Sequence, residues 1–250
     1  MFSTPSLMPR WQSAPCYAIL SVGSVCYAAP DEELLGKSAG YPVAPSLSQA
    51  FQERYRVGSF SAMDSMSAHC TLAPAAQPLP LTKAASEHAF QYRFDGKTFT
   101  LDDYMQRQRA TAVLVLKDGE IVAERKPEQR MLSNSMAKTI VALAFGKALE
   151  EGRIRSLDDR AADYGPRLAG SLYGDTNLGY GLQTWLLPGS TRRFALLGVY
   201  GQAIMVDPAL KLVVVHMAAA KDASGDASGA HMGAERNALW HGIVARYGRW

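Results

Sequence analysis

The sequence predicts a mixed α/β fold in which helices flank an antiparallel sheet. Two apolar runs, 112–116 and 121–125, are joined through an Asp-Gly pair, the strongest hairpin signal in the chain. A long apolar helix is expected directly after this hairpin, and several strand-like runs then follow one another before a last amphipathic helix. This order places the first hairpin beside the last strands, with helices packed against the sheet.

The composition is that of a globular protein. The chain has 250 residues, of which 48% are hydrophobic and 20% charged, enough for one domain or for a domain with a subdomain. The formal net charge is only +3, so neither a nucleic acid nor an anionic membrane surface is expected as a partner. The sequence contains no internal repeat.

Residues 1–28 have the pattern of a secretory signal. Arg10 supplies a positive flank, 14–25 an apolar core, and 26–28 (Cys-Tyr-Ala) a cleavage site. The alternative is a membrane anchor, but the apolar run is too short to span a bilayer comfortably, so no stable anchor is expected. Two of the three cysteines lie in this segment, which leaves Cys70 alone and excludes an internal disulfide. The sequence thus predicts a secreted or periplasmic protein.

The mature chain divides into an arm and a domain. Residues 29–86 are rich in Pro, Ala and Ser without a sustained period, which indicates an extended or irregular arm over the core. Residues 87–250 form the expected catalytic domain. Its predicted helices begin near 100, 134, 157 and 234, a turn-rich joint covers 171–179, and its closing strands are 180–187, 193–199, 202–206 and 210–217.

The helix after the hairpin is expected from Asn134 to about Glu151. Ser133 and Asn134 are cap formers, and Gly152 suits the left-handed position beyond a helix end. Because the first turns are apolar nearly all round, the helix should be buried.

Ser135 and Lys138 lie one turn apart on one face of this helix. A serine hydroxyl becomes a strong nucleophile only when a base takes its proton, and burial among apolar side chains would favour the neutral lysine amine. A serine in the first helical turn also lies near free backbone N–H groups that stabilise an oxyanion. The alternative is that this S-x-x-K pattern occurs by chance and that Lys138 simply reaches solvent. The apolar neighbours of the lysine argue against chance, so that the two interpretations are about equally supported.

Other catalytic and ligand-binding motifs are not found in the context that their chemistry needs. The one Gly-x-Ser-x-Gly match, at residues 36–40, does not follow a strand-like run and is therefore no nucleophile elbow. The sequence has no His-Glu-x-x-His helix and no phosphate-binding glycine loop. His231 and Glu235 are four apart, but two ligands do not make a metal site. Neither a metal nor an organic cofactor is expected.

Taken in order, these stretches resemble the serine β-lactamase and penicillin-recognising superfamily. The likeness is closest to its class C-like branch, which includes esterases and 6-aminohexanoate-dimer hydrolase. It covers residues 40–43 with 56–59, the hairpin 113–125, the segment 133–170 with Ser-Met-Ala-Lys, and the strands 179–215 with Gly-Val-Tyr-Gly-Gln at 198–202.

The resemblance implies a β-lactamase/transpeptidase-like fold and acyl transfer through an acyl-serine. Ser135 would be the nucleophile and Lys138 its base. The Ser135 N–H and one from the stretch Val199, Tyr200 and Gly201 would bind the oxyanion and substrate. A small-molecule amide or ester would be the substrate, with no cofactor.

The chain departs from the family in one respect. The helical subdomain that the resemblance implies would lie between residues 176 and 177, and the tyrosine motif carried there is not found. Two hypotheses follow: a serine hydrolase, whether or not impaired, or a non-catalytic shortened relative that at most binds ligands or partners. The substrate and the oligomeric state are left open.

Overall fold

The computed structural model describes most of the chain beyond the predicted signal. The signal segment 1–28 and the short helix expected near residue 157 lie outside the described residues, which are 31–71, 73–126, 130–153, 170–173, 176–181, 183–187, 192–224 and 231–248.

Within the described residues, nine strands form one large sheet in the order β1-β5-β4-β11-β10-β9-β8-β7-β6. Of these nine, β1 and β5 pair in parallel, and the other neighbours are antiparallel. The first hairpin lies beside the last strand, as predicted, because β4 pairs with β11. The strands are β1 (Thr82–Lys83), β4 (Ala110–Lys117), β5 (Glu120–Arg125), β6 (Gly170–Tyr173), β7 (Thr176–Gly181), β8 (Thr184–Leu187), β9 (Arg193–Leu197), β10 (Ala203–Asp207) and β11 (Leu212–Ala218).

The predicted hairpin β4–β5 turns at Asp118 and Gly119, whose φ angles of 53° and 84° are left-handed. Two left-handed residues match the twist of the flanking strands, which explains the Asp-Gly preference. The same signal recurs at Asp95 and Gly96, with φ of 47° and 73°. There it closes a separate two-stranded sheet of β2 (Gln91–Phe94) and β3 (Lys97–Thr100).

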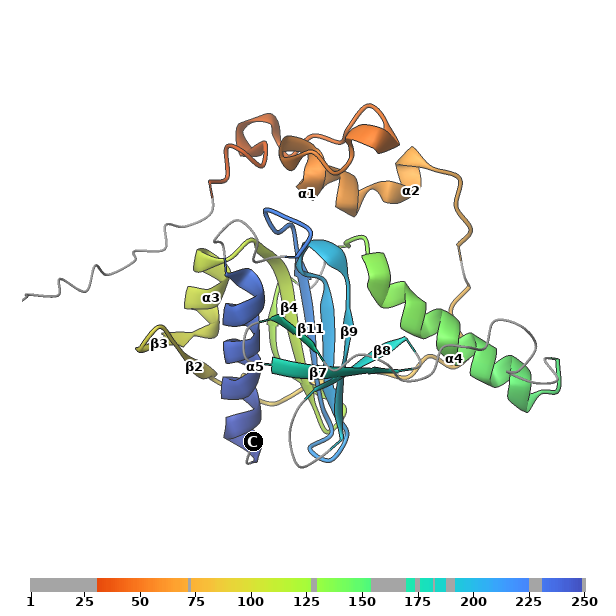
Figure 1. Cartoon of the computed structure of the whole chain (residues 1–250), viewed down its shortest axis with the longest axis vertical. Helices are drawn as coiled ribbons and strands as arrows, with labels where there is room; N and C mark the ends of the chain where they lie inside the picture. The colour runs from red at the N-terminus through yellow and green to blue at the C-terminus, as the bar shows by residue number, and fades with distance from the viewer. Residues whose placement is uncertain are drawn as a thin grey trace, which may run out of the picture.

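Helices α3 (Leu101–Arg107) and α5 (Met232–Tyr247) lie on one face of the large sheet (Figure 1). Thr100 and Asp103 form a capping box at the start of α3. The core contains buried apolar side chains from both helices and the central strands, among them Tyr104, Val115, Met205, Trp240 and Ile243. Within the described ranges, no helix combines the length and apolarity needed to cross a membrane.

Three segments differ from the sequence-based prediction. The expected joint 171–179 is occupied by β6 and the start of β7, and the expected strand 180–187 reverses direction, so that Gly181 of β7 pairs with Thr184 of β8. The arm is not irregular throughout, because it carries helices α1 (Glu53–Ser61) and α2 (Met63–Met66). The conformation of these segments depends on pairing with neighbouring strands and on packing against the domain, and local sequence patterns report neither.

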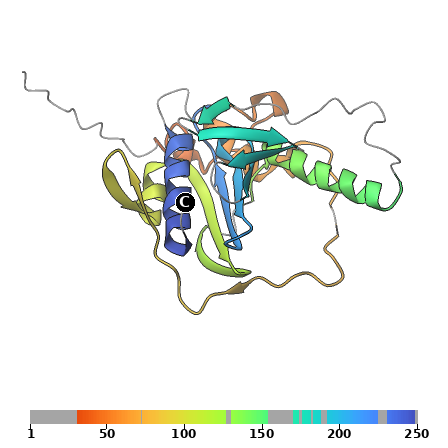
Figure 2. The same cartoon turned by 60° about the horizontal axis from the view of Figure 1, so that its bottom comes forward.

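The prediction of a buried helix after the hairpin is wrong. A 3-10 turn, η3 (Asn134–Met136), leads into α4 (Ala137–Glu150), which extends away from the sheet in both views (Figures 1 and 2). Ile140, Leu143 and Phe145 are 59%, 66% and 53% exposed. Only the first turn is anchored, through the buried side chains of Met136 and Thr139. The apolar pattern is typical of a core helix, but no described part of the chain covers it.

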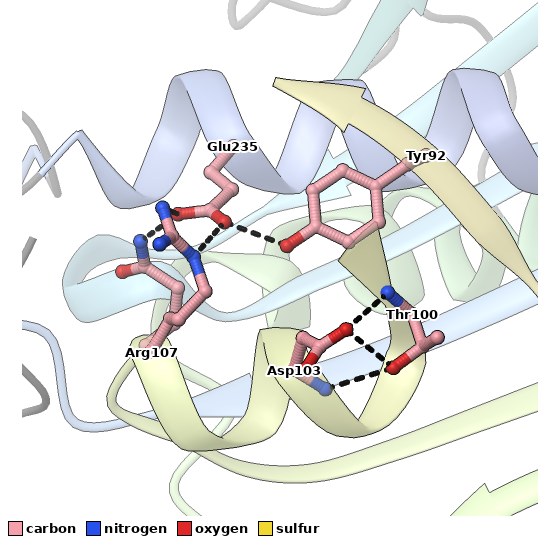
Figure 3. Close-up of polar contacts among 6 residues, drawn as sticks. Tyr92, Thr100, Asp103, Arg107 and Glu235 are labelled. Atoms are coloured by element: carbon pink, nitrogen blue, oxygen red, sulfur yellow. Dashed lines mark hydrogen bonds and ion pairs between the residues drawn. The ribbon is translucent and has the colours of Figure 1, made fainter. Parts of the chain in front are cut away.

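A buried carboxylate fastens α5 to the neighbouring elements (Figure 3). Glu235, fully buried, accepts hydrogen bonds from the Tyr92 hydroxyl at 2.6 Å, from Arg107 Nε at 2.8 Å and from the Gln108 amide. Burial and the adjacent carboxylate raise the pKa of Tyr92, which therefore stays a neutral donor. The network ties α5 to β2 and to the end of α3.

Replacing Glu235 by alanine should lower the free energy of unfolding by roughly 3 kcal/mol, because three donors lose their common acceptor. Urea unfolding at neutral pH measures this change. The matched control is Glu150→Ala, which removes an exposed carboxylate paired with Lys147 and should change stability little. Equal effects of the two substitutions would contradict a structural role for the buried network.

Candidate active site

A hollow of about 230 Å³ lies between the start of α4, the β7–β8 connection and the end of β9. It brings together the predicted residues Ser135, Lys138 and Val199, which come from two distant parts of the sequence. Tyr200 and Gly201 are not among its walls. The lining residues are Ser135, Lys138, Gln183, Trp185, Leu197, Gly198 and Val199.

The hydroxyl and the amine are in direct contact. Lys138 Nζ lies 2.6 Å from Ser135 Oγ, as the helical spacing predicts. Ser135 is partly buried, but Lys138 is exposed, so the prediction of a buried amine is wrong. The lysine lies on the exposed surface of the first turn of α4 and lines the hollow. A proton can pass between the two groups without any movement of the backbone.

Three hydrogen bonds fix the segment that carries Ser135. Thr139 Oγ1 donates to the Gln183 carbonyl at 2.7 Å, and the Asn134 side-chain amide donates to the Val199 carbonyl at 3.0 Å. Upstream, the Leu132 N–H donates to the Phe60 carbonyl of the arm at 2.8 Å. Asn134 therefore does not cap the helix as predicted. Its φ of 50° is left-handed, a conformation that asparagine tolerates, and its side chain reaches across to the end of β9.

Gly198 allows this close approach. A Cβ atom at position 198 would lie 2.6 Å from the Ser133 carbonyl oxygen and 3.2 Å from Asn134 Cβ. No side chain fits there without separating the end of β9 from the serine segment. The sequence offered a signal for this position in the Gly-x-x-Gly spacing of 198 and 201. Thr139 and Gln183 had no such signal, because a threonine inside a helix and a glutamine in a turn are ordinary residues.

The structure narrows the predicted oxyanion donors. The Tyr200 N–H donates to the Ala223 carbonyl at 3.0 Å, so it is not available to a substrate and the expectation for Tyr200 is revised. Gly201 lies in the interior, where an added Cβ would meet Met232 and Ala218. Val199 is the residue of the three that faces the hollow.

The turn 198–202 is fastened to β11 from the inside. His216 Nδ1 lies 2.7 Å from the Gly201 carbonyl, and Tyr104 Oη lies 2.9 Å from Nε2. Because a carbonyl only accepts, Nδ1 carries the proton and Nε2 accepts from the tyrosine. The Gln202 side chain adds hydrogen bonds to both backbone groups of Ala218. Burial, with the nearby positive charge of Arg236, lowers the pKa of His216 from 6.5 to about 3.

The polar side chains that line the hollow are the Ser135 hydroxyl, the Lys138 amine, the Gln183 amide and the Trp185 indole. Among the residues that the structure describes, no three His, Cys, Asp or Glu side chains come together in a group that could hold a metal ion.

His216 should make stability depend on pH. The folded state keeps the ring neutral down to about pH 3, whereas the unfolded chain binds a proton below about pH 6.5, so stability falls as the pH falls between these values. Between pH 7 and pH 5 this residue should remove about 2 kcal/mol. Urea unfolding should show the stability gap between the wild type and His216→Gln shrinking by that amount. A gap of equal size at both pH values would contradict the neutral ring.

Comparison with known proteins supports the fold. No protein-family model matches the chain, and no curated protein sequence matches it. A solved structure of a candidate 6-aminohexanoate-dimer hydrolase from Bacillus anthracis is similar, with a TM-score of 0.59 and 13% identity over 82% of this chain and 98% of that one. Identity this low shows the fold alone. The predicted mixed α/β fold, with its mostly antiparallel sheet and flanking helices, is confirmed as β-lactamase-like.

Proposed function

We propose that this chain is a serine hydrolase that cleaves an amide or ester through an acyl-serine at Ser135. One observation carries the proposal: the 2.6 Å contact between Lys138 Nζ and Ser135 Oγ at the wall of an open hollow. The signal-like pattern of residues 1–28 supports export of the chain, so the proposal includes a site of action outside the cytoplasm.

In the acylation step the Lys138 amine would act as the base and take the proton from Ser135 Oγ as the oxygen attacks the substrate carbonyl. The backbone N–H groups of Ser135 and Val199 would donate to the oxyanion that forms. The resulting lysine ammonium then gives its proton to the leaving alcohol or amine. No cofactor is needed for this step, because the charge that develops is confined to one oxygen.

Deacylation repeats the same transfers with water as the nucleophile. The neutral Lys138 amine takes a proton from water, and the hydroxide oxygen attacks the acyl carbonyl. Ser135 Oγ is the leaving group and recovers its proton from the lysine ammonium. The open hollow gives water direct access to the acyl group, so this step needs no conformational opening.

The walls of the hollow favour an uncharged acyl group of modest size. Trp185, Leu197 and Val199 contribute apolar surface, and the volume of about 230 Å³ suits a short chain. A small ester with a good leaving group is therefore the first substrate to test, because its chemistry demands little positioning from the rest of the site.

A fluorescent fluorophosphonate should label the purified wild-type protein and should not label Ser135→Ala. The reagent reports an activated serine hydroxyl regardless of the natural substrate. Ser133→Ala is the matched control, because it removes a neighbouring hydroxyl and keeps the backbone that contacts Gly198. Equal labelling of the wild type and Ser135→Ala would refute the proposal.

A second candidate function is that of a shortened, non-catalytic relative that binds a ligand or partner. Two observations favour it. The side chains of Ile140, Val141, Leu143 and Phe145 are exposed, as the loss of a covering subdomain would leave them. The described residues that line the hollow include no tyrosine, so Lys138 is the one acid–base group that they supply.

Hydrolysis of a nitrophenyl ester separates the two candidates. A serine hydrolase should release nitrophenol with saturable kinetics, and Lys138→Met should lower kcat by roughly 100-fold or more through loss of the base. Lys147→Met, on the exposed far end of the same helix, is the control and should retain the wild-type rate. Release that is identical in the wild type and Lys138→Met would favour the non-catalytic relative.

A further inference from the structure

The N-terminal arm contacts both sides of the candidate active site. On one side the Phe60 carbonyl accepts the Leu132 N–H, three residues before Ser135. On the other side the rings of Phe51 and Phe60 each lie 5.7 Å from the ring of Tyr200, in the turn after β9. Figure 1 shows α1 across the end of the sheet from which α4 departs. The arm therefore joins two segments that the hollow needs in register.

Arg56 of α1 is the centre of this contact. Its side chain is 5% exposed, and its guanidinium carbon lies 4.2 Å from the centroid of the Tyr200 ring. The same group donates to three backbone carbonyls, those of Phe51 at 2.8 Å, Lys221 at 3.1 Å and Ala220. A planar guanidinium can stack on a ring and donate in its own plane at the same time, which an ammonium cannot do.

Tyr200 needs such support. Its φ of 62° and ψ of 25° are left-handed, a region that a tyrosine avoids unless its surroundings impose it. The backbone is held at both ends, because the Tyr200 N–H donates to Ala223 and its carbonyl accepts from Ala220 at 3.1 Å. The stacked ring adds a third point of fixation. Two of these partners, Arg56 and Ala220, also bond to each other.

We propose that Arg56 is a positioning residue for acyl transfer at Ser135. By holding the Tyr200 ring it fixes the backbone of Tyr200 and of Val199 before it, and so the place of the Val199 N–H relative to Ser135 Oγ. This inference rests on the proposed function. It predicts a lower rate of acylation and unchanged substrate binding. A donor displaced by about 1 Å weakens the hydrogen bond to the oxyanion of the transition state more than any contact to the bound substrate.

The experiment compares Arg56→Met, Arg56→Lys and Tyr200→Gly with the wild type. Each should lower the rate of fluorophosphonate labelling and kcat for a nitrophenyl ester by roughly 10- to 100-fold, with KM changed less than about threefold. Arg56→Lys should not rescue the rate, since it keeps the charge and loses the stacked fork. Tyr200→Gly relieves the left-handed strain, so a low rate in this variant reports the lost ring.

Arg54→Met is the matched control. Arg54 lies on the same helix, is exposed, and stacks on Tyr55, outside the contacts described above. This variant should keep the wild-type labelling rate. Thermal unfolding of every variant shows whether a low rate comes from folded protein that reacts slowly or from protein that is partly unfolded. In the second case, lowering the temperature would restore the activity.

Amide hydrogen exchange of the peptide covering 196–201 reads the turn directly. Faster exchange in Arg56→Met, confined to this peptide and to the segment before Ser135, is expected. A folded Arg56→Met variant with wild-type labelling and exchange would overturn the positioning role alone. An unlabelled wild type would overturn the proposed function and the catalytic meaning of Arg56 with it, whatever the exchange shows.

Discussion

The contact between Gly198 and the Ser133 carbonyl is the constraint on which the candidate site depends. It joins the end of a central strand to the segment that carries Ser135, two parts of the chain some 65 residues apart. The approach is so close that backbone faces backbone, with the Asn134 side chain bonded across the seam. A side chain at position 198 would separate the hydroxyl from the Val199 peptide even if both elements kept their own structure.

Around this contact the molecule fixes one turn from two directions. His216 and Gln202 hold the turn 198–202 from the core, through hydrogen bonds to the Gly201 carbonyl and to Ala218. Arg56 holds it from the arm, through the Tyr200 ring. The inner bonds involve buried neutral groups and are insensitive to salt. The arm contact lies nearer the surface, so it is the part of the arrangement that a change in the arm can loosen.

A structural feature of this protein can be predicted from the sequence when residues close together in the chain determine it. The hairpin at Asp118-Gly119 and the pair Ser135 and Lys138 are set by turn chemistry and helical spacing, within a few residues of chain. Both are found in the structure, and the same Asp-Gly signal at residues 95–96 marks a second hairpin that the sequence analysis did not assign. The helix α1, by contrast, gains its stability from packing on Tyr200 and from hydrogen bonds to distant carbonyls, and its sequence has no clear apolar period.

The exposure of α4 could not be predicted for the same reason, because it depends on contacts outside the local sequence. An apolar helix pattern shows that burial would be favourable, and it does not show that a partner is present in the chain. The contact between Ser135 and Lys138 does not need that partner, because this part of the chain is fixed by Thr139, Asn134 and Met136, while the exposed large apolar side chains begin at Ile140. Proximity of nucleophile and base is therefore independent of enclosure of the substrate. These are separate contributions to catalysis, since the first sets how readily the serine is activated and the second how well water is excluded and the leaving group oriented. For the proposed reaction, a site with the first contribution and an uncovered α4 therefore favours small, reactive substrates, whose turnover depends least on enclosure.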